Sequence, residues 1–179
     1  MEDQQETAAV EAARRAALAR IRQWGDPVLR TPAAEVTEFG ADLRAQVEQM
    51  GELMDAAIGA GLAAPQVGSL RRLFVYRFSM EGPPRAIVNP RIEWSSPERQ
   101  SGPEGCLSIP DLAIEVERAL AVTMVGRAVD GSDVTIAAEG PDAIVLQHEL
   151  DHLDGILMLD RAERGERRRA IRELRARAA

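Results

Sequence analysis

The stretch "QHELDHLDG", residues 147–155, contains the only two histidines of this 179-residue chain. Residues four positions apart lie on one face of a helix, so a helix here would point His148 and His152 in the same direction. On a helix, the pattern His-Glu-x-x-His is typical of two imidazoles that bind one metal, with the glutamate beside a metal-bound water. The alternative is two histidines packed in a core or solvated on a surface, with Glu149 as an ordinary polar neighbour.

The flanking residues favour a helix around this pattern. Pro141 follows Gly140, and proline suits the first turn of a helix. Gly155 suits the left-handed conformation that ends one. Ile144 and Val145 lie one turn before the His-Glu pair, so they are predicted to line the same site.

Two histidines do not complete a catalytic metal site, which usually has three protein ligands and one open position for water. The only cysteine, Cys106, lies in "PEGCLSIP" between Gly105 and a strand-like run. A buried structural thiol is the ordinary interpretation of a single cysteine. A set of one cysteine and two histidines nevertheless suits a tetrahedral catalytic site, and we predict that Cys106, His148 and His152 form it.

The composition limits the class of protein. Hydrophobic residues make up 45% of the chain and aromatic residues 3%, so the core must be aliphatic. All 22 basic residues are arginine, which excludes a Schiff-base lysine and a phosphate-loop lysine. The net charge of −7 argues against a specific DNA binder, although residues 161–179 hold eight arginines against three glutamates.

The expected compartment is the cytoplasm. A single cysteine excludes an intrachain disulfide, which fits a reducing environment. The N-terminal segment opens with acidic residues and has no apolar signal core, and no apolar run reaches transmembrane length. We therefore expect no membrane association.

The remaining pattern predicts an α+β fold. Residues 41–58 have apolar side chains at helical spacing, whereas residues 95–105 indicate a loop. Strands are expected at 71–78, 85–94 and in several segments from 106 to 138, with a hairpin at Asp130-Gly131. Because hairpins connect them, we expect mainly antiparallel sheets around a central helix that carries the His-Glu-x-x-His motif, followed by a C-terminal helix.

Three segments together resemble peptide deformylase, the metal enzyme that removes the N-formyl group from new bacterial proteins. They are "GAGLAAPQ" (59–66), "EGCLS" (104–108) and "QHELDH" (147–152), in the family's order. The segments "GDPVLR", "LFVY" and "NP" also look familial, so the likeness covers about residues 20–162. It implies a single deformylase-like catalytic domain over residues 21–179, preceded by an extension, residues 1–20, that is helical or partly disordered.

The resemblance implies a role for each motif residue. The three predicted ligands would hold one divalent ion, Fe²⁺ in the cell, with Zn²⁺, Ni²⁺ or Co²⁺ also suited to the donor set. Glu149 would be the general acid and base, taking a proton from the activated water and returning it to the leaving amine. The side chain of Gln66 and the backbone N–H of Leu107 would bind the formyl oxygen, where an oxyanion develops.

The glycine loop is expected to lie against the substrate. Side chains at Gly59 and Gly61 would block a formyl peptide there. Between them stands Ala60, where the family often has a larger aliphatic residue. The resemblance places this loop opposite Ile144 and Val145, so Ala60 would complete an apolar slot for the substrate's methionine side chain.

The implied substrates are N-formylated nascent peptides in the bacterial cytoplasm. The Arg-rich C-terminal helix would dock on ribosomal RNA near the tunnel exit, or it is only a solvated charged face. A metalloprotease with the same motif is one alternative function, for which Glu173 is the available third ligand; its i±4 neighbours Arg169 and Arg177 are expected to pair with it instead. An inactive deformylase-like scaffold is another, although Glu149 and Gln66 are both present.

Overall fold

The computed structural model describes the backbone of residues 2–177 and the side chains of residues 7–177. Its elements are α1 (Glu2–Leu18), η1 (Pro27–Arg30), α2 (Ala41–Ala56), β1 (Gly61–Ala63), η2 (Ala64–Val67), β2 (Leu73–Tyr76), β3 (Arg85–Ser95), β4 (Arg99–Cys106), β5 (Ile109–Ala119), β6 (Ala121–Arg127), β7 (Asp133–Glu139), α3 (Pro141–Leu153), α4 (Met158–Arg161) and α5 (Arg164–Arg177). The α+β class with a C-terminal helix is confirmed. None of the helices in the described part combines the length and apolar character that a membrane span requires.

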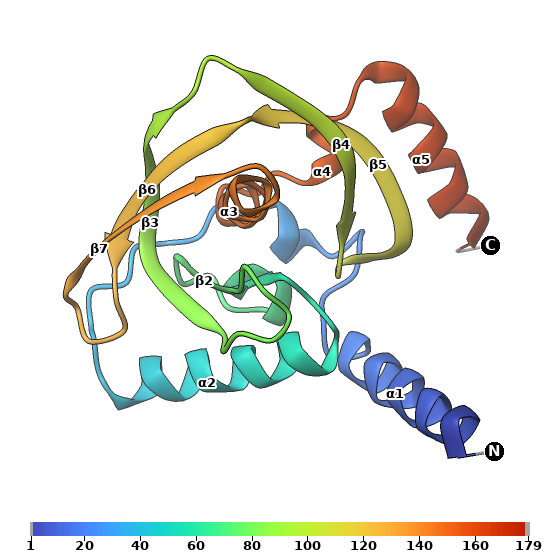
Figure 1. Cartoon of the computed structure of the whole chain (residues 1–179), viewed down its shortest axis with the longest axis horizontal. Helices are drawn as coiled ribbons and strands as arrows, with labels where there is room; N and C mark the ends of the chain where they lie inside the picture. The colour runs from blue at the N-terminus through green and yellow to red at the C-terminus, as the bar shows by residue number, and fades with distance from the viewer. Residues whose placement is uncertain (1, 178–179) are drawn as a thin grey trace.

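The strands form two antiparallel sheets, as expected. Five strands pair in the order β1-β2-β3-β6-β7, and β4 pairs with β5 alone. Figure 1 shows α3 nearly end-on, with the long strands curving around it, while α2 lies along the outside of the molecule. The helix that carries both histidines is therefore enclosed by sheet.

The alternation of side chains along β2 explains why helices cover both faces of the larger sheet. Successive side chains of a strand point to opposite faces. Leu73 and Val75 pack into the cluster that includes Met54 of α2, whereas Phe74 packs with Leu146 of α3. All four residues of β2 are buried, which accounts for its continuous apolar sequence.

A third apolar cluster attaches the C-terminal helix. Ile114 and Val116 of β5 pack with Met158 of α4 and with Ala170 and Leu174 of α5. The alternating exposed and buried residues of β5 produce this one-sided apolar face. The C-terminal helix thus packs on the smaller sheet through Ala170 and Leu174.

The prediction of a loop over residues 95–105 was wrong, because β4 occupies Arg99–Cys106. Pro103 and two glycines in this segment disfavour a strand, but proline is tolerated in a strand that has a partner on one side only. In the described structure β4 pairs with β5 alone. The pairing register shifts between Gly105 and Cys106, and such bulges redirect a side chain.

The predicted limits of the histidine helix are confirmed. α3 begins at Pro141 and ends at Leu153. Gly155 adopts a φ of +73°, and a Cβ there would lie 2.7 Å from the carbonyl oxygen of Arg30. The hairpin predicted at Asp130-Gly131 is also confirmed, since β6 and β7 pair across it. Local sequence signals therefore set both ends of α3.

Candidate metal centre

The structure brings the three predicted ligands together. One donor atom each of Cys106, His148 and His152 lies within 4.8 Å of the other two. Cys106 Sγ is 3.2 Å from His152 Nε2, and the two imidazole centroids are 5.0 Å apart. α3 supplies both histidines from consecutive turns, and the end of β4 supplies the thiol. A thiolate with two imidazoles is a donor set that fits a tetrahedrally coordinated divalent metal.

Glu104 fixes the orientation of one imidazole. Its Oε2 lies 3.0 Å from His148 Nδ1, which leaves Nε2 of that ring for a metal. Arg118 donates to both oxygens of Glu104, at 2.7 and 3.0 Å. Burial alone would raise the pKa of Glu104, but the hydrogen bonds and charges of His148 and Arg118 outweigh it and lower the pKa to about 2. Glu104 is therefore a carboxylate at neutral pH.

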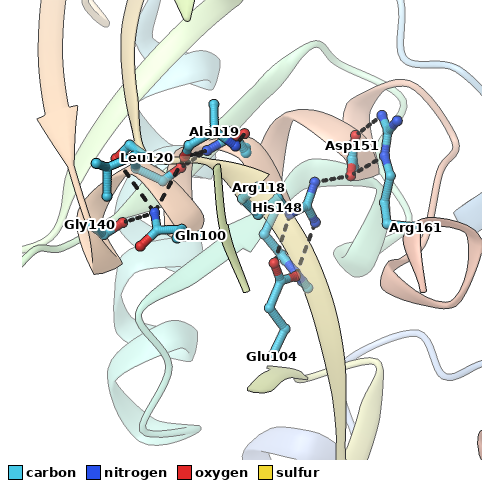
Figure 2. Close-up of polar contacts among 11 residues, drawn as sticks. Gln100, Glu104, Arg118, Ala119, Leu120, Gly140, His148, Asp151 and Arg161 are labelled. Carbon is cyan, nitrogen blue, oxygen red and sulfur yellow. Dashed lines mark hydrogen bonds and ion pairs between the residues drawn. The ribbon is translucent and has the colours of Figure 1, made fainter. Parts of the chain in front are cut away.

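The charged side chains continue from Glu104 through Arg118 and Asp151 to Arg161 (Figure 2). Arg118 Nη1 donates to Asp151 Oδ2 at 2.6 Å, and Arg161 donates to both oxygens of Asp151 at 2.6 and 3.0 Å. We call Glu104, Arg118, Asp151 and Arg161 the buried network. Its first three side chains are buried and Arg161 is 45% exposed. Buried charges require such pairing, because isolated ones would pay a large desolvation penalty.

Glu149 follows His148 on α3 and is enclosed by the protein. Its side chain is buried, and within residues 7–177 its Oε2 has no hydrogen-bond partner. Burial raises the pKa of Glu149 to about 7, against the opposing charge of His148. A Cβ at Gly61 would lie 2.3 Å from Glu149 Oε1, so the carboxylate can occupy this position only beside a glycine. A carboxyl group with a pKa near neutrality suits the exchange of protons.

Gln66 presents its amide nitrogen to the thiol. Its Oε1 accepts a hydrogen bond from the Ala63 N–H at 2.7 Å, which fixes the amide orientation. Its Nε2 lies 3.1 Å from Ser108 Oγ and 3.8 Å from Cys106 Sγ. Leu107 follows Cys106 directly, in the turn between β4 and β5. The two groups predicted to bind the formyl oxygen therefore lie next to the same ligand.

The predicted slot residues line the same cleft as two of the predicted ligands, Cys106 and His148. The cleft has a volume of about 550 Å³. Its walls include Ala60, Ile144 and Val145 together with His148 and Glu149. Both glycines of the loop, Leu107, Gln66 and Cys106 also line it. Sequence spacing and the resemblance thus identified residues that converge on one hollow.

Several residues to which no motif in the sequence assigns a role also lie at this site. Glu104 and Asp151 were not singled out, although metal-binding histidines generally donate their second nitrogen to a carboxylate or carbonyl, which was a usable signal. Arg14 and Leu18 of α1 also line the cleft. No local pattern predicts that contact, because it depends on how α1 packs against the rest of the chain.

Comparison with known proteins agrees with this geometry. Residues 18–168 match the family model described as polypeptide deformylase. Peptide deformylase 1 from Corynebacterium glutamicum is 44% identical over 164 residues, which cover 90% of this chain and 97% of that protein. The crystal structure of peptide deformylase from Thermotoga maritima has a TM-score of 0.77 and 43% identity, covering 80% of this chain and 97% of that one. A structure of a peptide deformylase from Legionella pneumophila has a TM-score of 0.82 and 36% identity, covering 87% of this chain and 92% of that one.

Proposed function

This chain belongs to the polypeptide deformylase family, and from that premise we propose that it removes the N-formyl group from the N-terminal formyl-methionine of newly synthesised polypeptides by metal-dependent hydrolysis. The observation that carries the proposal is a Cys/His/His donor set beside a buried carboxylate, with Cys106, His148 and Glu149 lining one cleft. We propose further that residues 21–179 form a single catalytic domain, preceded by an extension of residues 1–20, and that the enzyme acts in the bacterial cytoplasm.

We assign Cys106, His148 and His152 as ligands of one divalent ion, Fe²⁺ in the cell, with Zn²⁺, Ni²⁺ or Co²⁺ compatible with the same donors. When bound, such an ion lowers the pKa of a coordinated water toward neutrality and polarises the substrate's carbonyl group. Glu104 holds the His148 ring through Nδ1, which would leave Nε2 free to bind the ion. Burial and the positive neighbours of His152 lower its pKa, which favours the neutral imidazole that a metal requires.

We assign the proton transfers to Glu149. The buried carboxylate takes a proton from the attacking water and delivers it to the amine nitrogen that leaves the formyl carbon. Its raised pKa, about 7, supports this cycle because both protonation states are accessible near neutral pH.

We assign the Gln66 Nε2 group and the Leu107 N–H as donors to the oxygen of the tetrahedral intermediate. The hydrogen bond from Ala63 N–H to Gln66 Oε1 supports this assignment, since it aims the amide nitrogen at the cleft before substrate arrives. Preorganised donors stabilise the transition state without a cost of reorientation during the reaction.

We assign the apolar slot for the methionine side chain to Ala60, Ile144 and Val145. Gly59 and Gly61 have no side chains, which leaves room for an extended peptide beside the slot. Ala60→Ile should narrow the slot and lower kcat/KM for formyl-Phe peptides more than for formyl-Met peptides. Equal losses of kcat/KM on both substrates would show that Ala60 does not line the slot.

The direct test is hydrolysis of the peptide formyl-Met-Ala-Ser, in which the released formate is measured. Glu149→Gln should retain the metal and lose about 10²–10⁴-fold in kcat, the typical contribution of general acid–base catalysis. Cys106→Ala should lose the metal, as measured by elemental analysis, together with activity. Near-wild-type turnover by Glu149→Gln would refute the assigned mechanism.

The alternative of a metalloprotease is less well supported. Glu173, its available third ligand, pairs with Arg169 at 3.2 Å and with Arg177 at 2.6 Å on the surface of α5, as expected from the i±4 spacing. A protease that used Glu173 would keep its metal and its cleavage of unformylated peptides in Cys106→Ala. Loss of the metal in that variant separates the two functions.

We propose that α5 docks on ribosomal RNA through Arg164, Arg168, Arg172 and Arg175. These exposed arginines recur every three or four residues, so they share one face of the helix, and none of the described carboxylates pairs with them. Arginine at such spacing suits phosphates, and binding should weaken with salt. Replacing all four by glutamine should reduce co-sedimentation with ribosomes and spare peptide hydrolysis. Substitution is preferable to truncation, because α5 packs into the core through Leu174.

A further inference from the structure

The N-terminal helix forms part of the wall of the catalytic cleft. Figure 1 shows α1 projecting from the body of the molecule, with its C-terminal end beside α2. Residues 7–13 are exposed, whereas Arg14 and Leu18 are half-buried and line the cleft. Ala17, between them, is buried against the core and fixes this end of the helix. The family match begins at residue 18, so Arg14 lies outside it.

Arg14 faces Asp111 of β5 across the outer part of the cleft. Its Nη2 lies 3.8 Å from Asp111 Oδ1, and the two side chains are 37% and 73% exposed. A long, exposed ion pair of this kind contributes little. Because guanidinium has five N–H donors, Arg14 can bind a second carboxylate while it stays near Asp111.

The opposite wall is held in place independently of α1. Arg177 of α5 donates to the carbonyl oxygens of Pro110 and Asp111 at 3.0 and 2.9 Å. Asp111 adopts a φ of +60°, an uncommon conformation that these contacts help to maintain. The backbone that carries the Asp111 side chain is therefore held in place, and from it the carboxylate competes for Arg14.

The charges of the cleft make Arg14 distinctive. Within the described residues it is the only arginine that lines the cleft. Three of the described acidic side chains line it: Asp111 faces Arg14, Glu104 is neutralised by Arg118, and Glu149 is buried next to His148. Arg14 is thus the one side chain in the outer cleft that offers a positive charge to a substrate.

We infer that Arg14 is a specificity residue that favours formyl peptides with a carboxylate downstream of the first residue. The inference rests on the proposed deformylase function. With the formyl carbon at the metal ligands, the following residues can leave only along the cleft, advancing about 3.3 Å each. A carboxylate that reaches Arg14 gains a charge-assisted hydrogen bond. The source can be an acidic side chain or, in a short peptide, the C-terminus.

The test compares kcat/KM for amidated formyl-Met peptides that carry Glu or its neutral isostere Gln at residue two, three or four. At one of these positions the wild-type protein should prefer Glu about two- to fivefold, the range of an exposed ion pair, and NaCl should reduce the preference. A Gln peptide with a free C-terminus tests the other source of carboxylate. Arg14→Gln should bring the Glu/Gln ratio to about one, whereas Asp111→Asn, which removes the competing carboxylate, should raise it.

Arg15→Gln is the matched control, because Arg15 is exposed on the same helix turn and does not line the cleft. It should keep the wild-type ratio. A wild-type ratio of one at all three positions, or an unchanged ratio in Arg14→Gln, would overturn the inference. Failure of the wild-type protein to hydrolyse the neutral Gln peptides would instead count against the proposed function.

Discussion

The buried network and the surface network of α5 are built from the same chemical groups and differ in burial. The surface network comprises Glu166, Arg169, Glu173 and Arg177. Its shortest ion pairs measure 2.6 Å, and so do those of the buried network. The side chains of Glu104, Arg118 and Asp151 are 3–8% exposed, whereas those of the surface network are 24–46% exposed. Distance alone therefore does not rank these interactions.

Burial changes what each network can do. In water, an exposed pair gains little because both partners are well solvated when separated. In the interior, removal of one partner leaves a charge that neither water nor protein stabilises. The buried network can hold His148 in one orientation for this reason, while the surface network mainly fastens α5 to β5 through the carbonyl oxygens that Arg169 and Arg177 contact.

The largest expected effect is that of Arg118→Met. It removes the cation that Glu104 and Asp151 share, which leaves Glu104 with His148 and Asp151 with the partly exposed Arg161. The free energy of unfolding should therefore fall by about 3–5 kcal/mol. Urea unfolding of the variant and wild type, both loaded with zinc, measures this. Arg169→Met, on the surface, is the control and should unfold almost as the wild type does. Similar losses in both variants would mean that burial does not distinguish the networks.

Glu104→Gln should produce the next effect, on metal affinity. Loss of the carboxylate that orients His148 should weaken zinc binding about 10–100-fold, as other changes of a ligand's hydrogen-bond partner do. Competition with a chromophoric chelator gives the affinity. Glu173→Gln, in the surface network, is the control and should leave the zinc affinity unchanged. If Glu104→Gln binds zinc as tightly as wild type, the buried network does not position the ligand.

Asp160→Asn tests a case between the two extremes. The Asp160 side chain is 25% exposed, accepts a hydrogen bond from the Leu157 N–H, and pairs with Arg30 and Arg167. Burial would raise the pKa of Asp160, but these partners outweigh it and lower the pKa below 3.8. A carboxyl group whose pKa is lowered by folding stabilises the protein at pH values above the ordinary pKa. This stability is lost as the pH falls through the pKa of the folded state.

The variant should therefore be about 0.5–1 kcal/mol less stable than wild type at pH 7, within the range of partly exposed pairs. The difference should shrink as the pH falls below 3.8. Urea unfolding at several pH values measures both. A difference that persists undiminished at low pH would show that Asp160 acts through something other than its charge.

Arg169→Gln should have the smallest effect. Arg169 pairs with Glu166 and Glu173 at the surface, where water solvates all three groups. The urea midpoint should change less than in Asp160→Asn, and 1 M NaCl should abolish the change, since salt screens exposed charges. A salt-independent loss would point to the hydrogen bond from Arg169 to the carbonyl oxygen of Ala113.

Local sequence determined the parts of this protein that depend on neighbouring residues. The i and i+4 spacing of His148 and His152, with Pro141 and Gly155 at the ends, specified α3 and the shared direction of the imidazoles. Cys106 is the only cysteine, so it was the candidate for a third ligand, and the structure places its Sγ 3.2 Å from His152 Nε2. The limits of α3 were confirmed because helix geometry is set by residues within a few positions of one another.

Tertiary structure alone decided the features that join distant segments. β4 is a strand despite Pro103, because pairing with β5 outweighs the local preference for a loop. Glu104 meets Arg118 and His148 only when β4, β5 and α3 pack together. Arg14 reaches the cleft because α1 ends against α2, a contact that no periodicity in the sequence records. The free energy of these contacts comes from burial and pairing across the fold, and local spacing carries no information about either.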